Sequence, residues 1–118
     1  MKKFILSIDQ GTTSSKVVLF NTNFTPVDFI HKEFKQYFPK SGWVEHDALE
    51  IWNDVKFLIS NILKKNKLKP SQILSIGIAN QRETTVLWNK ENGKPVQKAI
   101  VWQDRRTVDI CNKLKKKN

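Results

Sequence analysis

The sequence predicts an α/β fold built around a mixed sheet. Short apolar runs of strand length are interrupted by two segments with helical spacing, in the order β-β-β-α-β-β-β-α. The first three runs follow one another through short links, which is typical of antiparallel strands. A nearly continuous apolar run after the first helix is typical of a strand buried on both faces. The order fits neither a regular βαβ repeat nor a sandwich.

The first three strands are expected near the N-terminus. Apolar runs predict strands over residues 3–8 and 16–21, and a third over 27–38, where the alternation of apolar and polar residues becomes indistinct after Phe29. Residues 39–43, rich in Pro, Ser and Gly, are expected to form a loop.

Residues 46–65 carry the clearest helical pattern. Asp47 and Glu50 have the spacing of a capping box, and Lys64 and Lys65 lie where cations suit the helix dipole. Apolar residues at steps of three and four predict one buried face, made of Leu49, Trp52, Val55, Ile59 and Ile62.

The second half predicts three strands and a closing helix. Residues 73–80 form the apolar run expected as the central strand, and strands are expected over 84–89 and 96–103. Asn92-Gly93 predicts a hairpin turn between the last two. A helix begins near Thr107 and places Cys111 on its apolar side, as an inert core thiol. This helix would have little to cover it, so we expect a longer parent protein.

Composition narrows the possible classes. The chain has 118 residues, 39% of them hydrophobic, which is globular composition. Its net charge of +10 is crowded into the lysine runs 64–69 and 113–117, which are more typical of solvated faces than of a nucleic-acid site. A single cysteine excludes an internal disulfide, and no apolar stretch approaches the ~20 residues of a membrane span. We therefore expect a cytoplasmic protein.

The stretch SIDQGTTSSK, residues 7–16, concentrates small polar groups between two apolar strands. Gly11 permits close approach of a ligand, and the residues that follow supply hydroxyls and N–H groups suited to phosphate oxygens. Asp9 suits a water-mediated Mg²⁺ ion, and Lys16 adds positive charge. On spacing alone, an ordinary Ser/Thr-rich hairpin remains the stronger alternative. The candidate phosphate-binding residues are Asp9, Gly11, Thr12, Thr13, Ser14 and Lys16.

Two further stretches contain candidate substrate residues. Arg82 and Glu83 follow the expected central strand, and a guanidinium beside a carboxylate can bind a polyol, although for these two residues taken alone a surface ion pair is the stronger interpretation. Trp102 offers an apolar wall for a small substrate, or else a core side chain. His31 and His46 lack metal-ligand partners and are expected to be structural or solvated.

Four stretches together carry a family resemblance: IDQGTTSSK, GWVEHDALEIW, IGIANQRETTVLWNKENGKPV and AIVWQDRRT. In this order they resemble the N-terminal part of the FGGY carbohydrate kinase family, and within it the glycerol kinase branch. The resemblance implies a ribonuclease H-like fold of the actin/Hsp70 ATPase type. Residues 1–118 would be part of the N-terminal, substrate-side domain, with the C-terminal domain absent. The implied reaction transfers the γ-phosphoryl group of ATP to glycerol, giving sn-glycerol 3-phosphate, with Mg²⁺.

The resemblance also implies roles for individual residues. Asp9 matches a metal-associated aspartate, and Thr12, Thr13 and Ser14 match phosphate contacts. Lys16 stands where the family commonly has arginine, so the bidentate fork is lost. Arg82, Glu83 and Trp102 match the residues that hold glycerol. The catalytic aspartate is expected beyond residue 118, so no catalytic residue is assigned here and the chain alone is expected to be inactive.

Other functions remain open at this point. The turn alone also fits another FGGY sugar kinase or a non-catalytic actin/Hsp70-like nucleotide-binding module, and the positive charge fits a polyanion-binding domain. The expected partners are glycerol and ATP, with no nucleic acid and no membrane. Uncovered strand edges lead us to expect a homo-oligomer.

Overall fold

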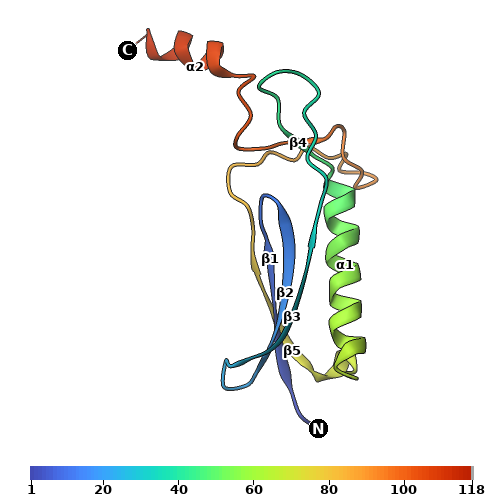
Figure 1. Ribbon diagram of the computed structural model, residues 1–118. Helices are drawn as coiled ribbons and strands as arrows, with labels where there is room; N and C mark the ends of the chain where they lie inside the picture. The colour runs from blue at the N-terminus through green and yellow to red at the C-terminus, as the bar shows by residue number, and fades with distance from the viewer. Residues whose placement is uncertain (118) are drawn as a thin grey trace. The chain divides into compact units, whose positions relative to one another are not determined.

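The computed structural model describes residues 1–117, which divide into two compact units. Unit 1 comprises residues 1–34 and 49–81, and unit 2 comprises residues 35–48 together with the chain from residue 82 onward. Figure 1 shows the course of the chain by residue number. None of the helices in the described part combines the length and the apolar character needed to cross a membrane.

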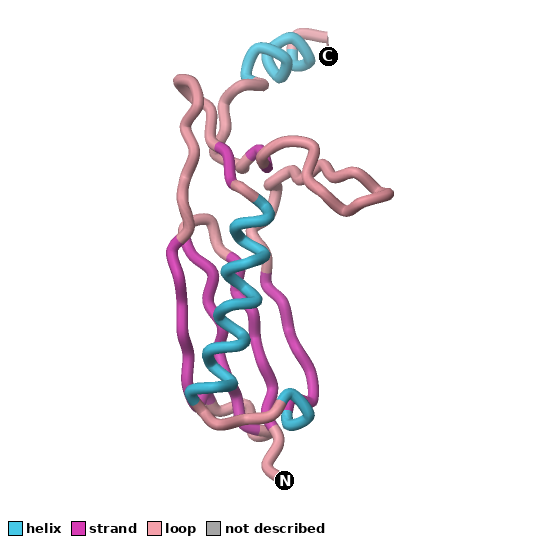
Figure 2. The backbone as a smooth tube through the Cα atoms, turned by 90° about the vertical axis from the view of Figure 1, so that its right-hand side faces the viewer, coloured by secondary structure: helices cyan, strands magenta, loops and turns pink. Residues whose placement is uncertain are grey.

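Unit 1 contains a four-stranded mixed sheet in the order β3-β2-β1-β5 (Figure 2). Strands β1 (Phe4–Gln10), β2 (Ser14–Asn21) and β3 (Pro26–Glu33) are consecutive and antiparallel, which confirms the expected meander. Strand β5 (Ile73–Ala79) runs parallel to β1, so both strands end at the same edge of the sheet.

Helix α1 (Ala48–Lys65) packs on one face of this sheet. Alternate residues of β1 and β2 point toward it, as the pleat requires, and the core consists of Phe4, Leu6, Ile8, Val17, Leu19, Val55, Leu58 and Ile62.

The buried face predicted for this helix was partly wrong. Leu49 is 49% and Trp52 56% exposed, whereas Leu58 is 2% exposed. The buried stripe runs through Val55, Leu58 and Ile62 at steps of three and four, rotated from the expected one.

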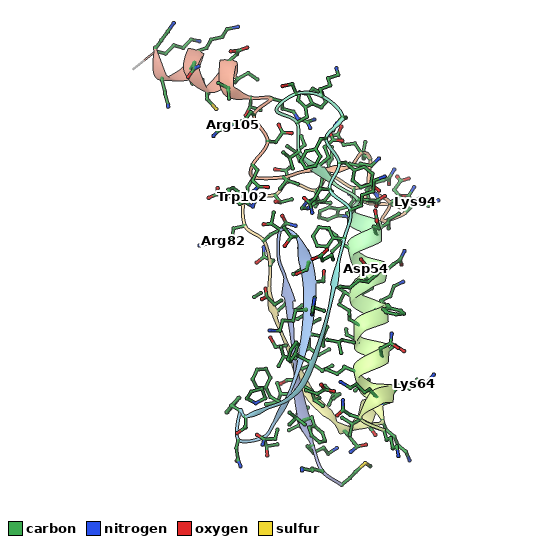
Figure 3. All side chains as sticks on the ribbon, in the orientation of Figure 1. Asp54, Lys64, Arg82, Lys94, Trp102 and Arg105 are labelled. Carbon is green, nitrogen blue, oxygen red and sulfur yellow. The ribbon has the colours of Figure 1, made fainter. Side chains whose placement is uncertain are left out.

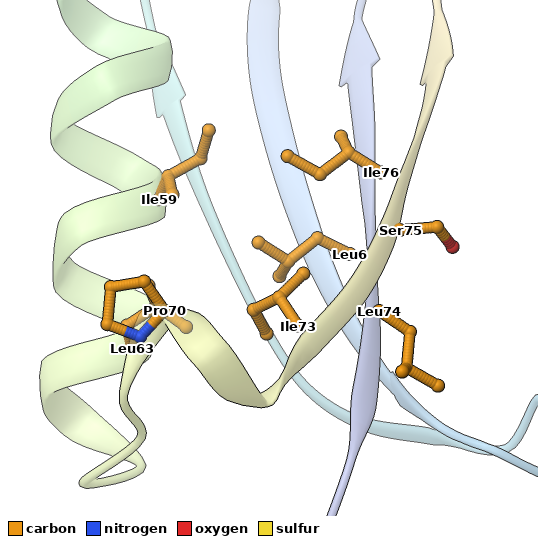
Figure 4. A pocket seen from close by; sticks show the side chains of 8 residues that line it. All are labelled: Leu6, Ile59, Leu63, Pro70, Ile73, Leu74, Ser75 and Ile76. Atoms are coloured by element: carbon orange, nitrogen blue, oxygen red, sulfur yellow. The ribbon is translucent and has the colours of Figure 1, made fainter.

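The expected central strand lies at the edge of the sheet, which corrects the sequence prediction. Within the described residues β5 pairs only with β1, and its apolar side chains after Ile73 are exposed, Ile78 to 72%. The reason is that the core contacts of α1 fall on β1 and β2. Beside β5 this leaves an apolar cavity of about 360 Å³ (Figure 4), lined by Leu6, Ile59, Leu63, Pro70, Ile73, Leu74, Ser75 and Ile76. A short 3₁₀ turn, η1 (Pro70–Gln72), leads into the strand.

Unit 2 has little regular structure. Strands β4 (Glu45–His46) and β6 (Ala99–Ile100) pair as a two-residue ladder, and α2 (Val108–Lys115) ends the described part. Residues 84–89 and 96–103 do not form the regular strands that the sequence predicts. They reduce to β6 and two isolated bridges, Thr85 to Ile100 and Trp88 to Pro95. Pro95 cannot donate to a ladder, and the neighbouring apolar side chains are exposed instead of facing a core.

The hairpin turn at Asn92-Gly93 is confirmed. Gly93 has φ +70°, which suits glycine, and its N–H donates to the carbonyl of Asn89 at 2.8 Å. Helix α2 contains no buried residue, so the expectation of a core thiol at Cys111 is wrong: the cysteine is exposed.

A partly buried ion cluster joins two parts of unit 2. The Asp104 carboxylate accepts the Val44 N–H at 2.7 Å and two guanidinium N–H groups of Arg106 at 2.8 and 2.9 Å. The same guanidinium donates to Glu45 at 2.8 Å and stacks 3.7 Å from the centre of the Trp43 ring. Two segments distant in sequence, residues 43–45 and 104–106, are thereby joined without a large apolar core.

His46 is a structural histidine, as expected. It is fully buried, with Nε2 2.6 Å from the Gln36 side-chain oxygen, and burial lowers its pKa.

Candidate functional site

The hydroxyl-rich turn lies at the tip between β1 and β2. Gly11 donates its N–H to the Ser14 carbonyl at 2.9 Å and closes the turn, while the Thr13 carbonyl accepts the Phe34 N–H at 3.2 Å. A Cβ on Gly11 would lie 3.2 Å from the Ser14 oxygen, a tight contact. Backbone crowding therefore favours glycine here, and Thr13 is exposed to solvent. This geometry leaves the end of the turn accessible to an anion.

Asp9 and Lys16 are cross-strand partners just below the turn. Asp9 is exposed. The Lys16 ammonium lies 4.7 Å from the centre of the Phe29 ring. Phe29 pairs with Val18, two residues farther from the turn, so the lysine side chain leads away from it. The positive charge of Lys16, expected beside the turn, therefore lies over the Phe29 ring in this conformation.

The end of β5 meets the turn at one edge of the sheet. Asp9 is aligned with Ala79 in the parallel pair β1–β5. Two residues later, the Gln81 side-chain amide donates to the Gln10 side-chain oxygen at 3.2 Å and to the Gly11 carbonyl at 3.3 Å. Unit 1 therefore brings the start of the NQRETT stretch to the turn, as an α/β ligand site at strand ends requires.

Arg82 and Glu83 begin the second part of unit 2, directly after Gln81 in the chain. Both are exposed, and the Arg82 side chain projects away from the backbone (Figure 3). Glu83 has φ +60°, a left-handed conformation that is unusual for a residue with a side chain. Such strain costs on the order of 1–3 kcal/mol and is found most often at functional sites.

Trp102 is 53% exposed, whereas the preceding Val101 is 2% exposed. A core position for this tryptophan is therefore wrong, since about half of its surface faces solvent. The Asp104 N–H donates to the Val101 carbonyl at 2.9 Å and closes the turn that carries Trp102.

Asp104 and Arg106 form a structural ion pair within one short stretch of the chain. Hydrogen bonds from Arg106 lower the pKa of Asp104 to about 2. Their two positions in the motif QDRRT gave no sign that both would join Glu45, some sixty residues earlier. Only the fold reveals the cluster.

The described residues contain no group of three His, Cys, Asp or Glu side chains that could hold a metal ion. Asp9 is thus a single exposed carboxylate beside the hydroxyl-rich turn. That arrangement fits Mg²⁺, which keeps most of its water and binds through one or two carboxylates together with substrate phosphates.

The sequence is similar to that of known proteins of one family. The N-terminal domain of the FGGY family of carbohydrate kinases matches residues 4–118. The chain is 55% identical over 115 residues to a glycerol kinase of Geobacillus sp. (strain WCH70), covering 98% of the chain and 23% of that protein. It is 58% identical over 114 residues to a glycerol kinase of Oceanobacillus iheyensis, covering 97% of the chain and 23% of that protein.

Solved structures show the same fold. Plasmodium falciparum glycerol kinase with ADP superposes with a TM-score of 0.90 at 35% identity, covering 99% of this chain and 24% of that one. A gluconate kinase of Lactobacillus acidophilus also gives a TM-score of 0.90, at 24% identity and with 99% and 23% coverage, a likeness of fold alone. The chain spans about a quarter of the length of the proteins it matches.

Proposed function

We propose, from the premise that this chain belongs to the FGGY family of carbohydrate kinases, that it forms the glycerol-binding part of an ATP-dependent glycerol kinase. The observation that carries the proposal is the sheet edge of unit 1, where the anion-binding turn and the start of the NQRETT stretch are hydrogen-bonded to each other. The identity of 55–58% with glycerol kinases supports glycerol as the polyol.

In this proposal the turn receives the phosphate end of the nucleotide. Thr12, Thr13 and Ser14 supply hydroxyl and N–H groups, and Gly11 keeps the backbone accessible. Asp9 would hold Mg²⁺, and the ion, when bound, would supply charge neutralisation on the phosphates. Lys16 contributes positive charge when its ammonium leaves the Phe29 ring.

The polyol binds to the residues that follow. Arg82 donates to glycerol hydroxyls, Glu83 accepts hydroxyl protons, and Trp102 covers the carbon atoms. The left-handed backbone of Glu83 supports this assignment, because strained conformations cluster at ligand-binding sites.

The proposed reaction needs groups that these residues do not provide. Phosphoryl transfer depends on positioning and on charge stabilisation from both sides of the reacting phosphate. We propose that residues 1–118 are one part of the substrate-side domain, and that the catalytic base comes from elsewhere in the full kinase. The reaction is assigned to the cytoplasm, which suits a protein with a single free cysteine.

A hybrid enzyme tests the proposal. In this hybrid, the chain replaces the matching segment of the Geobacillus glycerol kinase, and phosphoryl transfer from ATP is measured with glycerol, xylulose and gluconate. We expect kcat/KM for glycerol to exceed that for the other two by at least about a hundredfold, since mismatched hydroxyls leave Arg82 or Glu83 unpaired. Preference for xylulose or gluconate would reassign the substrate.

A further inference from the structure

The Gly11 carbonyl is held by two side-chain amides. Gln10 donates its Nε2–H to this oxygen at 2.8 Å, and Gln81 donates to it at 3.3 Å. Gln81 also donates to the Gln10 side-chain oxygen at 3.2 Å, so the two glutamines support each other. Gln81 is partly buried, which shields these bonds from competing water.

Holding this carbonyl fixes the donor on the other side of the same peptide group. A trans peptide is planar, and its C=O and N–H point in opposite directions. The oxygen of the Gly11–Thr12 peptide is turned toward Gln10 and Gln81. The two glutamine bonds therefore favour the present direction of the Thr12 N–H, and their loss removes that restraint on the peptide plane.

We propose that Gln81 is a positioning residue, which orients the Thr12 N–H of the turn through the Gly11 carbonyl; its catalytic consequence rests on the proposed function. The register of the sheet places Gln81 beside the turn. Asp9 is in register with Ala79, so the end of β5 brings Gln81 to the turn. The next residue in the chain is Arg82, so one side chain both orients the turn and fixes where the chain leaves the sheet toward the proposed polyol residues.

The first test uses the chain itself. Gln81→Glu keeps the shape but replaces the donor with an oxygen that repels the Gly11 carbonyl, and Gln81→Ala removes the group. In both variants we expect backbone amide exchange at Gly11–Ser14 to quicken about tenfold at pH 7, measured by NMR, with strand β2 amides such as Val17 unchanged. Gln97→Glu, the same change at an exposed glutamine, is the matched control.

The pH dependence separates a specific bond from a general loss of stability. Glutamate titrates near 4.3 in model peptides, and its protonated carboxyl can donate to the carbonyl again. Slow exchange at the turn should therefore return below that pH in Gln81→Glu and not in Gln81→Ala. If the turn amides of Gln81→Glu exchanged at the wild-type rate at pH 7, the proposal would be overturned.

The second test places the same variants in the hybrid enzyme. We expect kcat to fall about tenfold for both, with KM for glycerol within about twofold of the wild type, and Gln97→Glu to be unaffected. Unchanged kcat with a disordered turn would overturn the catalytic consequence. An inactive wild-type hybrid would count against the proposed function instead, and the exchange measurements would still decide whether Gln81 orients the turn.

Discussion

Arg82 is the residue on which glycerol recognition depends in this account. It is exposed, follows the sheet edge directly and carries a fork of N–H donors. In the hybrid enzyme, Arg82→Ala should lower kcat/KM for glycerol by roughly 10- to 150-fold, since lost hydrogen bonds from a charged donor cost about 1.5–3 kcal/mol.

The KM for ATP should stay within about twofold in that variant. Arg105→Ala removes an equally exposed arginine from unit 2 and is the control. Steady-state kinetics with glycerol and ATP varied separately provide the measurement. Equal losses in both variants would remove the assigned role of Arg82.

Glu83 combines strain with a proposed function. Its φ of +60° is unfavourable for any residue with a Cβ, and glycine adopts it freely. Glu83→Gly should therefore leave the free energy of unfolding unchanged or raise it by up to about 1 kcal/mol, while it impairs glycerol use. Urea unfolding of the chain together with hybrid kinetics checks both effects. Destabilisation together with normal glycerol kinetics would make Glu83 a structural residue.

The lowered pKa of Asp104 predicts how the stability of the chain depends on pH. Its pKa is lowered to about 2 by Arg106, below the ordinary value of 3.8, so the folded state favours the ionised form. This contribution is complete above about pH 4 and is lost as the pH falls toward 2. Asp104→Asn should destabilise the chain by about 1–3 kcal/mol at pH 7 and flatten the loss of stability between pH 4 and 2.

Asp28 serves as a control for that experiment. Hydrogen bonds from Lys65 and Asn66 lower its pKa too, but it lies in unit 1. Asp28→Asn should therefore leave the steep acid loss attributed to Asp104 in place. Circular dichroism follows the loss of folded structure as the pH falls. If Asp104→Asn lost structure over the same pH range as the wild type, the cluster would contribute nothing to stability in acid.

Among the elements, α1 provides most of the partner surface for the sheet. Leu58 is 2% exposed and lies in the core, whereas Leu49 on the same helix is 49% exposed. Leu58→Ala should cost about 2–5 kcal/mol, the usual range for a buried leucine. Leu49→Ala should change stability by less than about 0.5 kcal/mol. Comparable losses in urea unfolding would show that Leu49 packs more closely than its exposure indicates.

Periodicity predicted the elements that bury a face and was less reliable elsewhere. The meander β1–β2–β3 and α1 were predicted because apolar residues at steps of two or of three and four reflect a shared core. The strands expected around Asn92-Gly93 failed because apolar residues such as Trp88 and Val96 face solvent, so their pattern reports no packing. For β5 the composition was read correctly as a strand, but its neighbours depend on tertiary pairing.

The same contrast applies to the candidate site. The turn and the start of NQRETT meet at one sheet edge, because β5 runs parallel to β1 as far as Ala79 and Gln81 then hydrogen-bonds to Gln10. The direction of the Lys16 side chain was not predictable, because a flexible lysine selects its partner, here the Phe29 ring, only in the folded sheet. Likewise, nothing local links Glu45 with Arg106.

For the whole molecule, β5 predicts self-association. The strand carries no charged residue or proline, and its free edge and exposed Ile76 and Ile78 lack the usual protection against pairing. We propose that the isolated chain forms homo-oligomers through this edge. Ile78→Lys, which places a charge there, should shift light-scattering mass toward the monomer, whereas Leu49→Lys on α1 should not. A strictly monomeric wild type at high concentration would contradict this.

The most direct measurement is the rate of ATP-dependent glycerol 3-phosphate formation by the hybrid enzyme, compared with the intact Geobacillus kinase and with the chain alone. We predict a hybrid rate within about tenfold of the intact enzyme, because in our proposal this chain contributes the polyol site. We predict no detectable rate for the chain alone, since positioning from the rest of the kinase is missing. A folded but inactive hybrid, or a chain that phosphorylates glycerol unaided, would contradict it.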